Sequence, residues 1–364
     1  MSPRKVILLL GRRDEPTDGV ADYCGKLRGA GLARGLSFEI ARVHWAEKGW
    51  GDALAELREA AVAWRDCWVL LQFTTLAWSR RGFPLRAPRV LDVLRKGGAR
   101  PGVVFHDFFP LPGTGLVGSV REYCHLRVLR RLYAGSDLAI FTVPLEKLSW
   151  LPSQRDKAVF IPVGSNFPDL NRKIEKHETL PPSVATVAVF GITGGAAGIQ
   201  EVGDIVYTLR GTQSKGVRLR LMTVGRGTEV FEGELIKALK ETGIELSMLG
   251  LMSAEDLIQS LSSAQALLCV RGHVSSRRGS AIAGIVCGLP IVGYRGVETG
   301  FPITEAGVKL VEVRDRDGLV DSLYQVLTDE KLSLQLRQRS LAAGHNYFSW
   351  NAITSQFVTA MSAR

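Results

Sequence analysis

The chain has 364 residues, of which 46% are hydrophobic and 23% are charged. This balance excludes a disordered, collagen-like or coiled-coil protein, and the length favours two packed cores over one. The formal net charge is +10 and lies almost entirely in the first half: residues 1–180 carry 28 Lys and Arg against 19 Asp and Glu, a net of +9, and residues 181–364 carry 18 against 17, a net of +1. A basic half predicts an anionic partner, although a solvated surface has the same composition.

The start of the chain predicts a first strand and not a signal peptide. Its aliphatic run, residues 6–10, is followed at once by Arg12 and Arg13, and it is far shorter than the roughly 20 residues of a membrane-spanning helix. We therefore expect a cytoplasmic protein and leave peripheral contact with the inner face of the membrane open. The five cysteines have no CxxC spacing and predict neither a disulfide framework nor a zinc site.

Aliphatic runs alternate with stretches of helical period along the whole chain. In the first half, strands are expected at 5–10, 38–43, 67–73, 102–108, 138–143 and 158–163, and helices at 20–34, 52–64 and 119–134. In the second half, strands are expected at 184–191, 217–225, 244–250, 266–272 and 289–294, and helices at 200–210, 230–242, 253–263 and 318–344. This repeated alternation predicts an α/β fold with two Rossmann-like domains, each a doubly wound parallel sheet.

The boundary between the two domains is predicted from composition. The segment 171–183 is polar, charged and carries a Pro pair, as linkers often do. We therefore expect a first domain at 1–170, a linker at 171–183 and a second domain at 184–349.

Ligands of parallel sheets bind beyond the carboxyl ends of the strands, so the residues that follow strands are the candidates for binding. In the first domain, Asp18 and Gly19 open a helix whose backbone N–H groups can face a phosphate or a sugar oxygen, although such turns are often only structural. Gln72 ends a strand and can bond a hydroxyl or cap the strand. His106, followed by Asp107, can act as a base, orient a hydroxyl or simply complete a turn.

The second domain has a glycine-rich loop after its first strand. Gly191, Gly194 and Gly195 precede a helix, and such a loop lets a diphosphate approach backbone amides. The loop lacks the GK[ST] ending of an ATP-binding loop and the GxGxxG pattern of a dinucleotide site. Further along, Gly225–Gly227 contains Arg226, and Leu251 and Met252 could wall a base before a helix that Ser253 caps.

Residues 271–300 form the most distinctive stretch of the second domain. Arg277 and Arg278 stand before Gly279 and Ser280 at the start of a helix of small residues. Guanidinium groups bind phosphate oxygens with two parallel hydrogen bonds, so this pair is placed to clamp a diphosphate. An exposed basic turn is the alternative.

The order of segments resembles the GT-B-fold glycosyltransferases, most closely the retaining nucleotide-sugar-dependent enzymes of glycosyltransferase family 4. The matching segments cover nearly the whole chain; they are DGVADY, VVFHD, AGSDLAIF, FIPVGSNF, VAVFG with its glycine loop, TVGRGTE, MLGLMSAEDLIQSLSSAQALL, IAGIVCGLPIVGY and HNYFSW. The resemblance implies a donor-binding second domain and an acceptor-binding first domain, to which the last helix, 350–364, returns.

The resemblance also implies roles for the candidate residues. Catalytic roles fall to His106, Asp18 and Gly19, and acceptor contacts to Asp22, Tyr23, Gln72 and Asp107. The donor-binding residues would be Gly191, Gly194, Gly195, Arg226, Leu251, Met252, Arg277, Arg278, Gly279 and Ser280. The implied reaction moves a sugar from a UDP- or GDP-sugar to a glycan or lipid-linked acceptor with retention and without a metal or other cofactor.

Two features of the family pattern are missing from this chain. The paired glutamates of the family fall on Ser275 and Ala283, and the loop Arg and Lys that hold the donor diphosphate fall on Ile192 and Ala197. Because a diphosphate in a cleft needs compensating cations, we expect Arg277 and Arg278, with the amides of 194–198, to replace them. A pseudo-enzyme that binds nucleotide or glycan is the alternative.

The basic first half leaves two further partners to consider. It contains six of the seven tryptophans, which could contact anionic lipid, stack on sugars or fill the core. No RNP, helix-turn-helix or zinc pattern is present, so nucleic acid is not expected as a partner.

Overall fold

The computed structural model describes residues 4–14, 18–110, 115–165, 167 and 183–364. The chain divides into two compact units: unit 1 is Met1–Val163 with Trp350–Arg364, and unit 2 is Gly164–Ser349. Unit 1 ends before the expected boundary at 170 because Ser165 already belongs to unit 2, where its backbone N–H donates to the Phe348 carbonyl at 3.0 Å. The predicted linker 171–183 lies outside the described residues except for Ser183.

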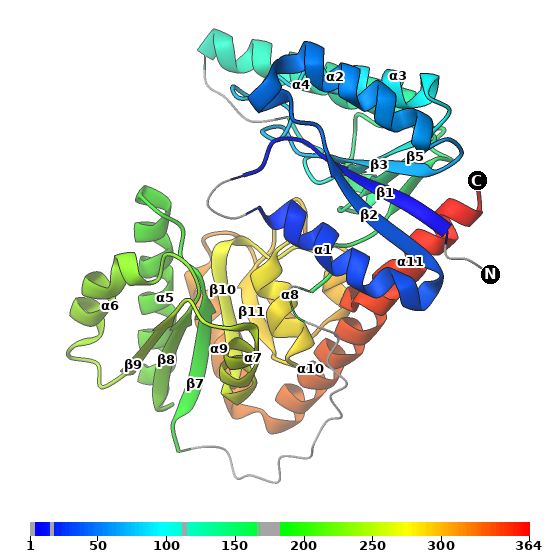
Figure 1. Cartoon of the computed structure of the whole chain (residues 1–364). Helices are drawn as coiled ribbons and strands as arrows, with labels where there is room; N and C mark the ends of the chain where they lie inside the picture. The colour runs from blue at the N-terminus through cyan, green and yellow to red at the C-terminus, as the bar shows by residue number, and fades with distance from the viewer. Residues whose placement is uncertain (1–3, 15–17, 111–114, 166, 168–182) are drawn as a thin grey trace. The chain divides into compact units, whose positions relative to one another are not determined.

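Unit 1 is a six-stranded parallel sheet with the strand order β2-β1-β3-β4-β5-β6 (Figure 1). Its strands are β1 (Arg4–Leu10), β2 (Leu36–Arg42), β3 (Trp68–Phe73), β4 (Arg100–Phe105), β5 (Leu138–Phe141) and β6 (Ala158–Phe160). Its helices are α1 (Gly19–Gly31), α2 (Trp45–Ala63), α3 (Ala87–Lys96), α4 (Gly115–Gly135) and α11 (Trp350–Ser362). The helix α3 was not among the expected elements.

Side chains of alternate residues separate the two faces of this sheet, because successive residues of a strand point to opposite sides. Ile7 and Leu9 of β1 pack in the cluster that contains α2, α3 and α4. Val6 and Leu8 pack in the cluster that contains α1 and α11. The C-terminal helix thus completes one of the two layers that cover unit 1.

The tryptophans of unit 1 belong to its core. Trp45, Trp78 and Trp150 are buried in the cluster that contains α2, α3 and α4, and Trp50 and Trp64 are partly buried against it. Trp68 is buried in the cluster on the other face of the sheet. Of the alternatives open from the sequence, packing accounts for these six side chains.

Unit 2 is a second six-stranded parallel sheet, with the order β12-β11-β10-β7-β8-β9. Its strands are β7 (Ala185–Phe190), β8 (Leu219–Val224), β9 (Glu245–Gly250), β10 (Ala266–His273), β11 (Ile291–Tyr294) and β12 (Val308–Val311). Its helices are α5 (Ala196–Ser214), α6 (Glu232–Leu239), α7 (Ala254–Ser263), α8 (Gly279–Val286), α9 (Arg316–Thr328) and α10 (Glu330–Ala343). The two doubly wound parallel sheets confirm the predicted fold class.

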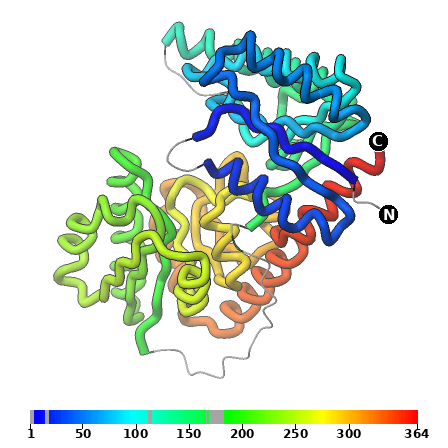
Figure 2. Tube along the Cα trace, in the orientation of Figure 1, coloured from blue at the N-terminus to red at the C-terminus, as the bar shows by residue number. Residues whose placement is uncertain are grey.

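The single helix expected at 318–344 is wrong, because two helices occupy this stretch. Asp329 has an extended backbone conformation, and its side chain accepts a hydrogen bond from the Leu332 N–H. The residue therefore ends α9 and caps the first turn of α10. Figure 2 shows this part of the trace, coloured orange, as it passes from α9 to α10.

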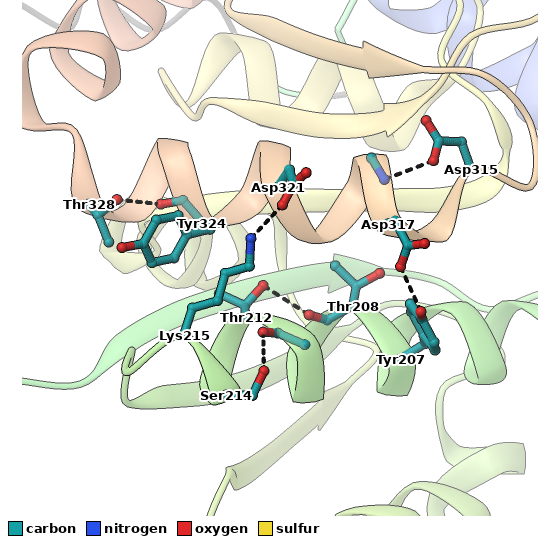
Figure 3. A network of polar contacts seen from close by, with 12 residues as sticks. Tyr207, Thr208, Thr212, Ser214, Lys215, Asp315, Asp317, Asp321, Tyr324 and Thr328 are labelled. Carbon is teal, nitrogen blue, oxygen red and sulfur yellow. Dashed lines mark hydrogen bonds and ion pairs between the residues drawn. The ribbon is translucent and has the colours of Figure 1, made fainter.

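Helices α5 and α9 pack side by side on one face of unit 2 and are joined by polar contacts (Figure 3). The Tyr207 hydroxyl donates to Asp317 at 2.6 Å, and Lys215 pairs with Asp321 at the other end of the seam. Both pairs are exposed, so each contributes at most about 1 kcal/mol.

Each sheet has a point where the chain reverses its direction of winding. In unit 1 this point lies between β1 and β3, and in unit 2 it lies between β7 and β10. The loops that leave such neighbouring strands diverge, and the crevice beyond their carboxyl ends is where open α/β sheets bind ligands.

Candidate functional site

A pocket of unit 2 lies at this reversal point. Its cavity volume is about 10 Å³, and its walls come from the ends of β7 and β10 and the first turn of α8. Among the residues that line it are Gly191, Arg271, His273, Arg278 and Ser280. Three of these, Gly191, Arg278 and Ser280, are expected donor-binding residues, and the fold brings them together.

The glycines beside this pocket allow two loops to pack backbone against backbone. Gly227 has a φ of +85°, and a Cβ there would lie 2.2 Å from the Ile192 carbonyl oxygen. The Ile192 N–H donates to the Arg226 carbonyl at 3.2 Å. The Gly225–Gly227 turn therefore supports the loop that follows β7, whose Gly194 and Gly195 are exposed just before α5.

Two guanidinium groups supply positive charge to the pocket. Arg271 lies near the end of β10, and its Nε donates to the Thr193 hydroxyl at 3.2 Å, so it is tied to the glycine-rich loop. Arg278 approaches Gly272, where an added Cβ would lie 2.8 Å from Nη2. Burial lowers the pKa of Arg278, the charge of Glu298 opposes this shift, and the neighbouring Arg277 and Arg271 add to it. The pocket therefore carries two cations that an anionic ligand would stabilise.

Arg271 was not predicted as a site residue, although its position near the end of a strand indicated one. The residue stands at the carboxyl end of the strand ALLCVR, the position from which the other candidates were chosen. Its role as a wall of the pocket depends on β10 lying directly beside β7, which the order of elements alone does not specify.

Arg277 is held differently from its neighbour. Its Nε donates to Glu298 Oε2 at 2.8 Å, and it does not line the pocket. The Ser275 hydroxyl also donates to Glu298 at 3.3 Å, and His273 Nε2 lies 3.6 Å from the same carboxylate. In this structure the charge of Arg277 is thus compensated within the protein.

Glu298 is a buried carboxylate with a strongly shifted pKa. Burial opposes its ionisation, but the contacts with His273 and Arg277 outweigh burial and lower the pKa to about 2. Glu298 was not predicted as a site residue. Its carboxylate lies beside Ser275, one of the two positions at which the family pattern has glutamate, whereas the other, Ala283, is buried in α8.

The remaining predicted donor residues lie outside the lining of the pocket. Leu251 is 72% exposed and Met252 partly exposed in the loop after β9, and Arg226 is exposed after β8. Gly279 is the first residue of α8. Contact of these residues with a donor stays a prediction.

In unit 1, Gln72 and His106 meet at the ends of neighbouring strands. His106 Nε2 and Gln72 Oε1 are 2.9 Å apart, and Gln72 Nε2 donates to the Leu70 carbonyl at 3.1 Å. Because the Gln72 oxygen is then the acceptor, Nε2 of His106 carries the proton of this hydrogen bond.

Tyr23 packs against this pair of residues. Its ring lies edge-on to His106 at 5.2 Å between centroids, and 5.4 Å from Trp350. Within the described residues the buried Tyr23 hydroxyl has no hydrogen-bond partner, and burial raises its pKa. Asp22, another predicted acceptor residue, is exposed, whereas Tyr23 is buried.

Asp18 and Gly19 have the structural role that the sequence left open. Asp18 caps α1 by accepting from the Ala21 N–H at 3.0 Å, and Arg42 Nη2 lies 3.3 Å from its other oxygen. Arg42 also donates to the Gly11 carbonyl and so ties this cap to the end of β1. A catalytic role for Asp18 or Gly19 stays a prediction.

Asp107 takes part in a buried chain of hydrogen bonds that the sequence did not reveal. Its carboxylate accepts from the Thr75 N–H at 2.8 Å, and the Thr75 hydroxyl is 2.8 Å from His125 Nε2. Burial lowers the pKa of His125, and the charge of Asp107 opposes this shift. The chain fixes the loop after β3 against the one after β4.

The described part of the chain has neither a metal-binding cluster nor a membrane-spanning helix. There, no three His, Cys, Asp or Glu side chains are grouped so that they could hold a metal ion. None of its helices is long and apolar enough to cross a membrane.

The whole fold is that of the GT-B glycosyltransferases, in which two parallel sheets with interleaved helices follow one another in the chain. A glycosyltransferase from Rickettsia africae has a TM-score of 0.68 at 13% identity, with 100% of this chain and 99% of that chain covered. HepE of Anabaena, solved in complex with UDP and glucose, has a TM-score of 0.64 at 13% identity, with 99% and 100% covered.

A third similar structure is WaaG, a glycosyltransferase involved in lipopolysaccharide biosynthesis, with a TM-score of 0.62 at 13% identity and 99% and 100% covered. No protein-family model and no curated protein matches the sequence. The comparisons therefore establish the fold, and function has to be argued from the residues of this chain.

Proposed function

We propose that the protein is a glycosyltransferase that moves a sugar from a nucleotide-sugar donor to a glycan or lipid-linked acceptor. The proposal rests on one observation above all: Arg271 and Arg278 line a pocket at the reversal point of the unit 2 sheet. HepE, which shares the fold, was solved with UDP and glucose.

The charge of a nucleoside diphosphate explains why this pair matters. A diphosphate cannot leave water without cations or donors to compensate it. Arg271 and Arg278 would bind the phosphate oxygens, and the exposed amides that begin α5 would add donors at the positive end of a helix. Of the two arginines expected from the sequence, this assignment retains Arg278 and replaces Arg277 by Arg271.

Unit 1 would bind the acceptor. The hydrogen bond between His106 and Gln72 fixes the orientation of the ring at the end of β4, where it can contact a substrate hydroxyl. For a retaining transfer, the donor phosphate itself would take the proton of the attacking hydroxyl. We propose retention on the resemblance to family 4 and assign His106 to contact with the donor sugar or acceptor.

Calorimetric titration with UDP, GDP and their sugars tests the donor site. One nucleotide class should bind the full-length protein, and Arg271→Ala and Arg278→Ala should each weaken binding by about tenfold or more, because each removes a charge-assisted hydrogen bond. Arg220→Ala is the matched control, since Arg220 pairs with Glu245 on the exposed edge of unit 2. Unchanged affinity in both pocket variants would refute the assignment.

A binding protein without transfer activity is the second candidate. It is favoured by Ser275 and Ala283, which stand where the family has carboxylates. The two functions separate in an assay over a panel of nucleotide sugars and acceptors: the pseudo-enzyme binds a donor by calorimetry yet releases no nucleoside diphosphate from it.

A further inference from the structure

The first two turns of α4 present apolar side chains to the solvent. Leu116 is 84% exposed, Val117 69%, Val120 51% and Tyr123 65%. Leu116, Val120 and Tyr123 follow one another at the i, i+4, i+7 spacing that places them on one side of a helix. Single exposed apolar residues are ordinary, but a continuous row of them indicates a surface that contacts something less polar than water.

The packing of α4 does not account for this row. Gly118 is the buried residue of the first two turns, and His125, Val128, Leu129 and Leu132 continue the buried side along the rest of the helix. The outward row lies away from this side. In Figure 1 the first turns of α4 extend past the neighbouring helices α2 and α3 of the same unit.

Basic residues continue the same surface toward the end of the helix. Arg127, Arg130 and Arg131 are exposed, and within the described residues no hydrogen bond or ion pair holds them. Glu122 is the one acidic residue of α4. Arg89 and Lys96 of the adjacent helix α3 add exposed positive charge.

We infer that this surface of α4 docks the protein on an anionic lipid bilayer. Apolar side chains beside a group of arginines match the boundary between acyl chains and negatively charged headgroups, where the apolar groups insert and the cations meet phosphate. A bilayer can accept an exposed helix without a surface of matching shape. A protein partner would need a groove that fits the helix.

Flotation with lipid vesicles tests this inference on the full-length protein. The protein should float with vesicles of phosphatidylcholine and phosphatidylglycerol, and bind at least about tenfold less to vesicles of phosphatidylcholine alone, because each basic residue near an anionic surface contributes roughly a fivefold gain in binding. Added salt should weaken the binding, since the attraction between charges is screened.

Two sets of substitutions separate the parts of the surface. Leu116→Gln with Val120→Gln removes the apolar row, and Arg127→Gln with Arg130→Gln and Arg131→Gln removes the charge. Each set should lower binding to anionic vesicles by about tenfold or more. All five side chains are exposed, so the unfolding midpoint should stay unchanged.

The matched control lies in unit 2. Val230 and Ile236 are 66% and 50% exposed beside Glu232 and Glu234 of α6, so Val230→Gln with Ile236→Gln should leave vesicle binding unaltered. The inference is overturned if the protein does not float with anionic vesicles, or if the α4 variants bind as well as the wild type. Stronger binding to duplex nucleic acid, lost in the arginine variants while flotation persists, would also overturn it.

Discussion

Glu298 is a buried carboxylate that gives two adjacent arginines different surroundings. The adjacent Arg277 and Arg278 look equivalent in the sequence, yet one pairs with Glu298 and the other lines the pocket. Breaking a buried ion pair is costly because the remaining charge loses its compensation. We therefore expect the two arginines to differ in function, with Arg277 supporting the fold and Arg278 supporting the ligand.

The pKa of Glu298 predicts a pH dependence of stability. Its folded pKa of about 2 lies below the value of about 4.3 for an unfolded glutamate. Its contribution is therefore complete above about pH 4.3 and is lost as the pH falls toward 2. Glu298→Gln should reduce the free energy of unfolding at pH 7 by up to about 3 kcal/mol and flatten its decline in acid, as measured by urea denaturation at several pH values.

Glu245→Gln provides the comparison for this measurement. Glu245 pairs with Arg220 in the same unit, but both side chains are about half exposed, so the loss should stay below about 1 kcal/mol. An equal loss of unfolding free energy in the two variants would show that burial does not determine how much the pair of Glu298 and Arg277 stabilises the protein. Adding Ser275→Glu to Glu298→Gln returns a carboxylate to this place and should restore part of the stability.

His106 is the residue of unit 1 for which we expect the largest effect on transfer. His106→Ala removes both the ring and its hydrogen bond to Gln72, and kcat/KM for sugar transfer should fall by about a hundredfold, because a substrate that is misplaced by about 1 Å reacts that much more slowly. His44→Ala is the control, because His44 is half exposed at the start of α2. A His106→Ala enzyme with the full transfer rate would reject this role.

At the scale of elements, the two loops beside the pocket depend on glycine for two separate reasons. Gly227 has a positive φ and also stands against the Ile192 carbonyl, whereas Gly216 has a φ of +93° with open space around it. Gly216→Ala should therefore cost about 1–2 kcal/mol from backbone strain alone. Gly227→Ala should cost clearly more and should also weaken nucleotide binding. Urea denaturation and calorimetry check this, and equal losses in the two variants would contradict the packing of these loops.

The sequence predicts the elements well where burial is complete and poorly where it is not. The run Val6–Leu10 is almost fully buried and is recognisable as a strand. Strand β12 escaped notice because Val308–Val311 is short and only half buried at the sheet edge. The boundary at Asp329 escaped because helical periodicity continues on both sides of one extended residue.

Some features of the candidate site could likewise be predicted from the sequence, and others could not. That Gly191 and Arg278 follow strands is visible in the sequence, and the fold places both in one pocket. The pairing of Arg277 with Glu298, and of Thr75 with His125, joins residues distant in the chain. Such contacts depend on strand order and loop conformation, which local patterns do not contain.

At the scale of the whole molecule, the two units differ in charge and in aromatic content. The positive excess lies in the first half, and all seven tryptophans lie in unit 1, in Met1–Val163 or Trp350–Arg364. Tryptophan fluorescence therefore reports on unit 1 alone, whereas circular dichroism reports on both units. This gives a direct way to follow the two cores separately.

The contribution of the C-terminal helix can be measured with this probe. Phe357 of α11 is fully buried against Phe38 of β2, and Phe357→Ala should cost about 3–5 kcal/mol through the cavity it leaves. The unfolding transition followed by tryptophan fluorescence should move to a lower urea concentration. Phe348→Ala, at an equally buried position in unit 2, should move the circular dichroism signal and leave fluorescence nearly unchanged. If Phe348→Ala shifted the fluorescence transition and left circular dichroism unchanged, the result would contradict this division.

The central claim is that a nucleotide sugar bound by Arg271 and Arg278 is consumed by transfer. The most direct measurement is the release of nucleoside diphosphate from a panel of UDP- and GDP-sugars in the presence of glycan and lipid-linked acceptors. We predict release from one donor class with the wild-type protein, and a loss of about tenfold or more in Arg271→Ala and Arg278→Ala. Absence of release from every donor, or full release in both variants, would contradict the claim.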